Sequence, residues 1–194
     1  MTARLAFGAL LTLALGCAHP EPPPPPPPSP AAAPPASGPF VELQHRYAGT
    51  YLYAGGETER RAVSGAVEHA ISGMSFLAKP VARSSLKQRA EVRDSYSLSF
   101  DGLGTVEVAT PGFPLEAGPL DGKPVKLENK SGDVSQVSFG FVDGALVQKG
   151  HTEDGGGETD YRLADDGATL LVHRLMQSAQ LTAPVDFTLT YRRQ

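Results

Sequence analysis

Apolar and polar residues alternate one by one through most of the chain after residue 91. Residues 95–100 read SYSLSF, and residues 185–191 read VDFTLTY. A period of two places every second side chain on the same face, which is the pattern of a half-buried β-strand. The repetition of this pattern predicts a mainly β fold.

Short dipeptides that end in glycine separate the alternating stretches. They are Asp101-Gly102, Asp121-Gly122, Ser131-Gly132, Asp143-Gly144, Asp154-Gly155 and Asp166-Gly167. Glycine at the second position accepts the positive φ of a tight hairpin turn, so each strand should turn straight back beside the previous one. We therefore expect an antiparallel up-and-down meander without crossover helices.

The segment ahead of the meander has a helical period. Apolar residues from Val63 to Met74 recur every three or four positions, and Pro80 suits the first turn of a second helix that ends near Arg89. Before both helices, the tyrosines of residues 41–53, Tyr47 among them, indicate a short strand. A meander this long would leave two exposed edges if it were flat, so we expect a roughly ten-stranded barrel with a helix pair inserted after the first strand.

This order of elements resembles the fatty-acid-binding-protein branch of the calycins, in which two helices cap the mouth of a barrel. Gly49-Thr50-Tyr51 and Arg192 or Arg193 also resemble the Gly-x-Trp motif of lipocalins and its packing arginine. The chain has no Trp, so Tyr51 would replace the aromatic residue. The resemblance implies a calycin-like barrel in which Gly49 and Tyr51 have a structural role.

A barrel of more than about eight strands is not filled by its own side chains, so we expect a cavity beneath the helices of residues 57–89. The residues expected to line it are Met74, Phe100, Phe139, Phe141, Phe187, Tyr191 and Arg193. Fatty-acid-binding proteins hold a carboxylate with an inward Arg-x-Tyr on the last strand. Here Tyr191 and Arg193 share one face and would suit an anionic head group. The alternative is that Tyr191 packs and Arg193 lies in solvent near the terminus.

The start of the chain has the features of a processing signal, residues 1–16. Its apolar run from Leu5 to Leu15 covers about 16 Å as a helix, which is too short to cross a bilayer. Ala14-Leu15-Gly16-Cys17 resembles the lipobox of bacterial lipoproteins, which implies acylation of Cys17. It also implies a lipid anchor in the outer membrane, facing the periplasm or the cell surface. Ordinary secretion and an uncleaved cytosolic start are the alternatives.

Residues 17–39 follow as the lipidated cysteine and a linker rich in proline and alanine. Proline tracts favour the polyproline II helix, so the linker could extend to roughly 70 Å as a spacer. A ligand for a proline-recognition module is the alternative. Residues 40–194 then form a single domain.

Composition and motifs exclude several classes of function. The formal net charge is −4 and becomes −5 when the signal takes Arg4 away, which argues against a nucleic-acid partner. The motifs of serine hydrolases, zinc proteases and phosphate-binding loops are missing from the sequence, so we expect no catalytic residue, metal or cofactor. The acidic, glycine-rich residues 153–160 are interpreted as a hairpin tip instead of a calcium loop. His173 alternates with leucines and could enter the interior.

These observations together predict a lipid-anchored, non-enzymatic envelope protein that binds an apolar or amphipathic small molecule in a barrel cavity. The alternative is an envelope interaction or assembly lipoprotein with a packed barrel and a protein partner. An enzyme would need polar groups that converge inside the barrel.

Overall fold

Ten antiparallel strands form one sheet in the computed structural model, which describes residues 39–128 and 134–194. The predicted signal, Cys17 and most of the predicted linker lie outside the described residues. The elements are α1 (Pro39–Tyr47), β1 (Gly49–Tyr53), α2 (Gly56–Ala70), α3 (Lys79–Arg89), β2 (Ser95–Phe100), β3 (Thr105–Ala109), β4 (Glu116–Pro119), β5 (Val125–Glu128), β6 (Val134–Val142), β7 (Ala145–Thr152), β8 (Gly155–Leu163), β9 (Thr169–Gln177) and β10 (Val185–Arg193).

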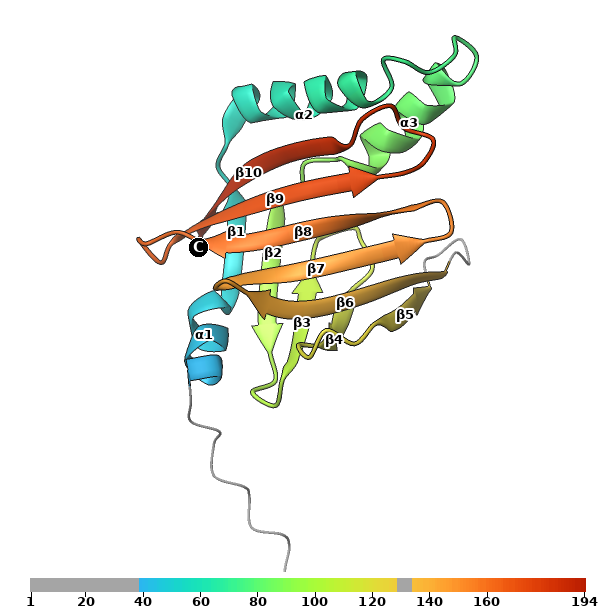
Figure 1. The fold of residues 1–194 in the computed structure, drawn as a ribbon. Helices are drawn as coiled ribbons and strands as arrows, with labels where there is room; N and C mark the ends of the chain where they lie inside the picture. Colours follow the sequence, from blue (N-terminus) through green and yellow to red (C-terminus); the bar gives the residue numbers. More distant parts are fainter. Residues whose placement is uncertain (1–38, 129–133) are drawn as a thin grey trace, which may run out of the picture. The chain divides into compact units, whose positions relative to one another are not determined.

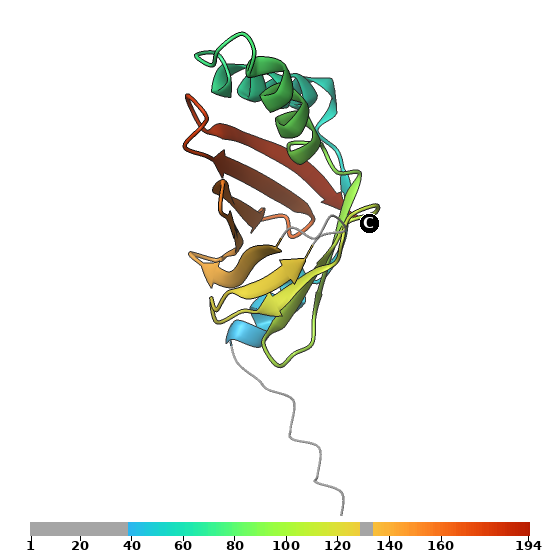
Figure 2. The ribbon, with the colours of Figure 1, turned by 90° about the vertical axis from the view of Figure 1, so that its right-hand side faces the viewer.

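The first strand joins the two ends of the meander. Tyr53 of β1 pairs with Tyr191 of β10, and Tyr51 pairs with Tyr96 of β2. The sheet therefore runs β4-β3-β2-β1-β10-β9-β8-β7-β6-β5, and its two free edges are the short strands β4 and β5. The gap between these two edges is the seam of the barrel. An isolated bridge from Asp121 to Gly140 of β6 lies beside it. The result is a nearly closed ten-stranded barrel with a helix pair after the first strand, which confirms the expected fold class (Figures 1 and 2).

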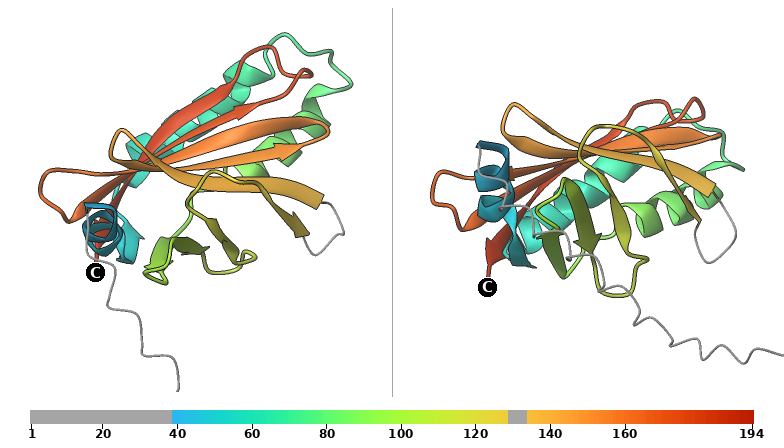
Figure 3. Two further views of the ribbon diagram at one scale, coloured as in Figure 1. Left: turned by 60° about the horizontal axis from the view of Figure 1, so that its bottom comes forward. Right: turned by 90° about the horizontal axis from the view of Figure 1, so that it is seen from below.

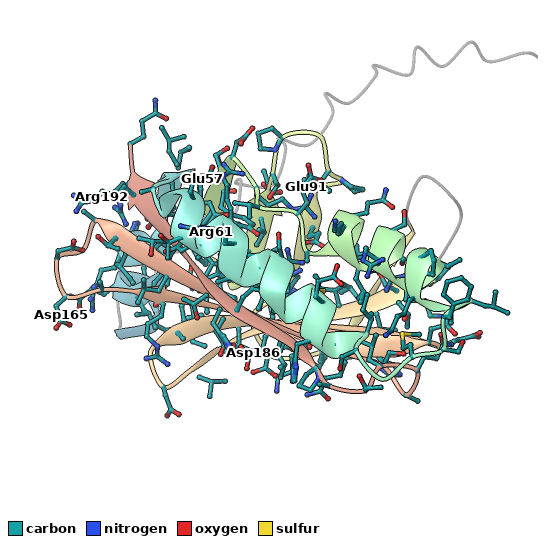
Figure 4. The ribbon with its side chains drawn as sticks, turned by 90° about the horizontal axis from the view of Figure 1, so that it is seen from above. Glu57, Arg61, Glu91, Asp165, Asp186 and Arg192 are labelled. Carbon is teal, nitrogen blue, oxygen red and sulfur yellow. The ribbon has the colours of Figure 1, made fainter. Side chains whose placement is uncertain are left out.

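Helix α2 takes the place of a strand along one edge of β10. Because β1 ends at Tyr53, the rest of that edge has no strand partner. Instead Glu59 accepts hydrogen bonds from the backbone N–H (2.9 Å) and the hydroxyl (2.7 Å) of Thr190. At the other end of the helix, the backbone N–H and the hydroxyl of Thr182 donate to the carbonyl of Ala70. The helix shields the strand edge along this length (Figure 4).

Residues 39–47 correct one expectation, because they form helix α1 and not a strand. Phe40 and Tyr47 lie on one face of this helix and pack edge-on against Phe141, with ring centroids 5.9 and 5.4 Å away. The Tyr47 hydroxyl donates to the carbonyl of Gly144 (2.7 Å) and accepts from the backbone N–H of Leu163 (3.0 Å). Helix α1 is thereby fixed at the lower end of the barrel (Figure 3).

Inward-facing side chains fill the half of the barrel that lies nearer α1, which we call the lower interior. Its members are less than 2% exposed; they include Tyr51, Tyr161, Leu170, Val172, Leu189 and Tyr191. Tyr96 meets both Tyr161 and Tyr191 edge-on, at 5.5 and 5.0 Å between ring centroids. The expected cavity therefore does not extend to the α1 end.

None of the helices in the described ranges is long and apolar enough to cross a membrane.

Candidate functional site

Two arginines belong to the half of the barrel nearer α3, which we call the upper interior. Arg174 on β9 pairs in register with Phe187 and follows the inward residue Val172 by two positions, so it shares that face. Arg93 lies in the irregular segment between α3 and β2, and its side chain is only 13% exposed. The Nη1 atom of each arginine is buried and has no hydrogen-bond partner among the described residues. Glu91 is 3.9 Å from Nη1 of Arg93, which is too far for a hydrogen bond.

These nitrogen atoms leave two buried donors unsatisfied in the upper interior, although Glu91 and Glu116 act on the charge of Arg93 in the stabilising direction. Burial lowers the pKa of Arg93, and the charge of Arg174 acts in the same direction. A guanidinium nevertheless keeps its proton in proteins, so both side chains remain cations. A buried cation without a full set of acceptors is destabilising, and an anion between the two would relieve that cost.

A chain of hydrogen bonds crosses the barrel beside the arginines. The Tyr161 hydroxyl donates to Oε1 of Gln148 (2.9 Å), and Nε2 of Gln148 donates to Oε2 of Glu116 on β4 (2.8 Å). Burial raises the pKa of Tyr161 well above its usual value and raises that of Tyr96, so both phenols stay protonated at neutral pH. Glu116, Thr159, Arg174 and Met176 are half-buried, in contrast to the fully buried lower interior.

The loop between β3 and β4 covers Arg93 on its outer side. The ring of Phe113 in this loop lies over the guanidinium of Arg93, which is a cation–π arrangement. Phe113 is itself 38% exposed, so it separates the arginine from solvent.

The residues expected to line a ligand cavity divide between the two ends of the barrel. Phe187 lies 5.8 Å from the Arg174 guanidinium, and the Tyr191 hydroxyl donates to the carbonyl of Arg93 (3.0 Å). Phe100 and Phe141 stack near α1 at 6.2 Å. Phe139 is buried and would contact any side chain on Gly118, and Met74 packs at the edge of the core after α2.

Arg193 belongs to the pair that the lipocalin resemblance implies. Its guanidinium carbon lies 5.1 Å from the centre of the Tyr51 ring, and Nη2 donates to the Tyr51 hydroxyl (2.6 Å) and to the carbonyl of Arg46. Gly49 lies beside this guanidinium, and its φ of 151° is a conformation that favours glycine, whereas a Cβ there would make only an ordinary contact of 3.7 Å with the arginine. The side chain is half-buried instead of lying in solvent. A ligand contact of Arg193 stays a prediction.

His173 points out of the barrel, which corrects the expectation that it could enter the interior. Val172 and Arg174 face inward, so the residue between them must face outward with Leu171 and Leu175. Its Nε2 lies 2.8 Å from Asp186, and its Nδ1 lies 3.6 Å from Asp160.

Two open hollows lie on the outer surface. One, of about 590 Å³, is formed by the outer faces of β7, β8 and β9 around Lys149 and Leu175. The other, of about 540 Å³, runs along α3 from Pro80 to Gln88. Neither contains the arginines of the upper interior.

Sequence reasoning missed the four polar residues that organise the upper interior: Arg93, Glu116, Gln148 and Arg174. Arg174 could have been found, because it lies two residues from Val172 on a strand with a clear alternation. Arg93 could not, because it precedes the strand and no alternation assigns it a face.

No protein-family model and no curated protein matches the chain. Among solved structures, an abundant heat soluble (SAHS) protein from Ramazzottius varieornatus is similar with a TM-score of 0.51 and 11% identity, over 77% of this chain and 96% of that one. Lipid binding protein 8 of Caenorhabditis elegans gives a TM-score of 0.50 and 9% identity, over 77% and 96% of the two chains. Fatty-acid-binding protein 1 of Echinococcus granulosus gives 0.49 and 12%, over 77% and 98%. At these identities the likeness to the first two establishes the fold alone, an antiparallel β-barrel with a helix pair after its first strand.

Proposed function

We propose that this protein is a membrane-tethered, non-enzymatic binding module whose barrel takes up an amphipathic small molecule by its anionic group. The observation that carries the proposal is the pair of buried, unpartnered Nη1 atoms of Arg93 and Arg174. Two cations that face one space attract an anion, and a site that is already desolvated strengthens that attraction.

The surroundings of the arginines suit an amphipathic molecule. Phe187 and Met176 offer apolar surface next to Arg174, and Tyr96 adds an aromatic wall beside Arg93. Because the lower interior is packed, the apolar part of the ligand would lie under the helices and toward the mouth. The Caenorhabditis elegans neighbour is a lipid binding protein, which is consistent with such a ligand in this fold.

The tether part of the proposal is supported by the sequence. Ala14-Leu15-Gly16-Cys17 fits a lipobox, and the proline-rich residues 18–39 fit a spacer. Acyl chains on one cysteine would hold the protein on a membrane durably, since each buried methylene contributes about 0.8 kcal/mol. We place the protein at the outer membrane, facing the periplasm or the cell surface. Mass spectrometry of the N-terminal peptide tests this directly: an acylated Cys17 is expected, and an unmodified thiol would exclude the anchor.

The binding part is tested on residues 34–194, which form one compact unit with its own core. Lipid extraction and native mass spectrometry should find an anionic amphiphile on the purified unit. In a fluorescence displacement assay, Arg93→Met and Arg174→Met should each weaken binding of an anionic amphiphile by about ten-fold or more. Arg192→Met, on the exposed face of β10, is the matched control and should leave binding unchanged. Equal binding by all four proteins would contradict the proposal.

A second candidate is an envelope interaction protein with a packed barrel. The filled lower interior favours it, and so do Phe76 and Leu77 between α2 and α3, which are 85% and 81% exposed. A unit that purifies without ligand, and whose arginine variants bind anionic amphiphiles like the parent, would favour this candidate over the first.

A further inference from the structure

The upper interior holds a carboxylate among its cations, and this sets a finer demand on the ligand. Glu116 shares an inward face with Val108, its register partner on β3. Its Oε2 accepts from Gln148, whereas Oε1 accepts no hydrogen bond from the described residues and is not among the buried unpartnered atoms. Oε1 is therefore a free acceptor that solvent, or a ligand, can reach.

Glu116 and the arginines lie in the same half of the barrel. Arg174, Thr159 and Gln148 are register neighbours on three successive strands, which places Gln148 about 10 Å from Arg174 along the sheet. Gln148 reaches from this row to Glu116 across the barrel. Glu116 also acts on the charge of Arg93. An anion held by the two guanidinium groups would thus lie close to Oε1.

A simple carboxylate would fit this space poorly. It would attract Arg93 and Arg174 but would be repelled by Glu116, because like charges at short range disfavour each other in a partly desolvated site. A hydrogen-bond donor on the ligand next to its anionic group would change this balance. It would donate to Oε1 and turn the repulsive neighbour into a partner.

We infer that the ligand carries a hydroxyl or amide N–H donor two or three bonds from its anionic group, as β-hydroxy acids and N-acyl amino acids do, and that Glu116 accepts from this donor. The inference rests on the proposed function and names the class of ligand for the same site. Arg93 and Arg174 then select for the negative charge, and Glu116 selects among anionic amphiphiles of equal length.

The test compares decanoate, β-hydroxydecanoate and N-octanoylglycine by isothermal titration on residues 34–194. The two donor-bearing probes should bind about ten-fold more tightly than decanoate, because a hydrogen bond to a charged acceptor has roughly that effect. In Glu116→Gln this preference should fall to within about two-fold, chiefly because decanoate binds more tightly once the repulsion is gone. Arg174→Met should weaken all three probes by the same factor.

Glu116→Asp keeps the charge and withdraws it by one methylene. It should reduce the preference for the donor-bearing probes without improving the binding of decanoate. This result would distinguish the effect of the side chain's length from the effect of its charge. Urea unfolding of each variant confirms that it is folded.

Equal affinity of the parent for all three probes, or an unchanged preference in Glu116→Gln, would overturn the inference while leaving the anion site in place. Binding of decylammonium in preference to every acid would overturn both the inference and the anionic ligand of the proposed function. Failure of every acid to bind the folded parent would do the same.

Discussion

The contact between Arg193 and Tyr51 joins the last strand to the first where the barrel closes. Arg193→Met removes the hydrogen bond to the Tyr51 hydroxyl and the contact with the carbonyl of Arg46, while it keeps an apolar stem. We expect the free energy of unfolding to fall by about 1–3 kcal/mol in urea titrations. Arg192→Met changes the neighbouring outward residue and should stay within about 0.5 kcal/mol of the parent. Similar losses of unfolding free energy in both variants would show that the contact between Arg193 and Tyr51 contributes no more to stability than an exposed arginine does.

Asp166 makes the turn between β8 and β9 sensitive to acid. Its carboxylate accepts hydrogen bonds from the backbone N–H of Ala168 and from the backbone N–H and hydroxyl of Thr169, and these bonds lower its pKa to about 2. The unfolded chain should titrate near about 3.9. Because the folded pKa is the lower one, this contribution to stability is complete above about pH 4 and is lost as the pH falls through 2.

The urea midpoint of the parent should therefore fall more steeply between about pH 4 and 2 than that of Asp166→Asn. The control is Asp165→Asn: this residue lies in the same turn (Figure 4), and none of the hydrogen bonds among the described residues involves its side chain. An identical slope for the parent and Asp166→Asn would show that the turn does not bind the carboxylate in this way.

At this scale the sequence predicted contacts that follow from strand parity and missed those that depend on polar residues facing inward. Tyr191 and Phe187 were assigned to the interior correctly because every second residue of β10 is buried. Glu116 lies on a strand of four residues, and such a strand is too short for an alternation to assign its faces. A charged side chain there is normally taken as solvent-exposed.

Two glycines whose surroundings would accept a Cβ should respond to alanine substitution with opposite changes in the free energy of unfolding. Gly65 lies on the exposed face of α2 and Gly144 lies in the hairpin between β6 and β7 with a φ of 76°, and a Cβ on either would meet nothing within 4 Å. Gly65→Ala should raise the free energy of unfolding by about 0.5–1 kcal/mol, since alanine is the better helix former. Gly144→Ala should lower it by about 1–2 kcal/mol, because a left-handed backbone disfavours a Cβ. Thermal unfolding of the pair measures both signs, and a shift of both in one direction would contradict the assignment.

Glu59 holds α2 against the free edge of β10. Glu59→Ala would leave the N–H and the hydroxyl of Thr190 without their carboxylate partner, and we expect a loss of about 1–3 kcal/mol. The Thr190 amide should also exchange with solvent faster. Glu57→Ala is the control for the loss of a negative charge in the first turn, because Glu57 lies two residues earlier in α2 and is largely exposed (Figure 4). Unchanged exchange at Thr190 would mean that the helix does not protect this edge.

Among the elements, the helix pair and the longer strands were predictable because their periods and turn dipeptides agree, whereas β4 and β5, of four residues each, are too short to show an alternation. The hairpin at Asp143-Gly144 has the positive φ at both residues that its sequence indicates. Helix α1 was missed because Gln44 interrupts the apolar stripe between Phe40 and Tyr47, so the tyrosine alternation with β1 dominated the pattern.

For the whole molecule, Tyr47 connects parts of the chain that are far apart in sequence. Its hydroxyl bonds Gly144 and Leu163, which are 97 and 116 residues away. Tyr47→Phe should lower the free energy of unfolding by about 1–3 kcal/mol, because it leaves two backbone groups without a partner. Tyr53→Phe removes an exposed hydroxyl that donates to the nearby carbonyl of Gly56, and it should have a much smaller effect in the same urea titration. Equal losses of unfolding free energy in the two variants would mean that the Tyr47 hydroxyl does not stabilise the lower end of the barrel.

The seam between β4 and β5, which no strand ladder closes, is the place where the diameter of the barrel can change most easily. Every other neighbouring pair of strands is joined by a ladder of backbone hydrogen bonds, whereas β4 and β5 share no ladder. The bridge from Asp121 to Gly140 and the hydrogen bond from Gln148 to Glu116 cross this gap, so widening there would break far fewer hydrogen bonds than widening at a ladder. Expansion of the barrel on heating or on binding of a bulky ligand should therefore occur mainly at this seam. Distance measurements between spin labels on β4 and β5 would detect it directly.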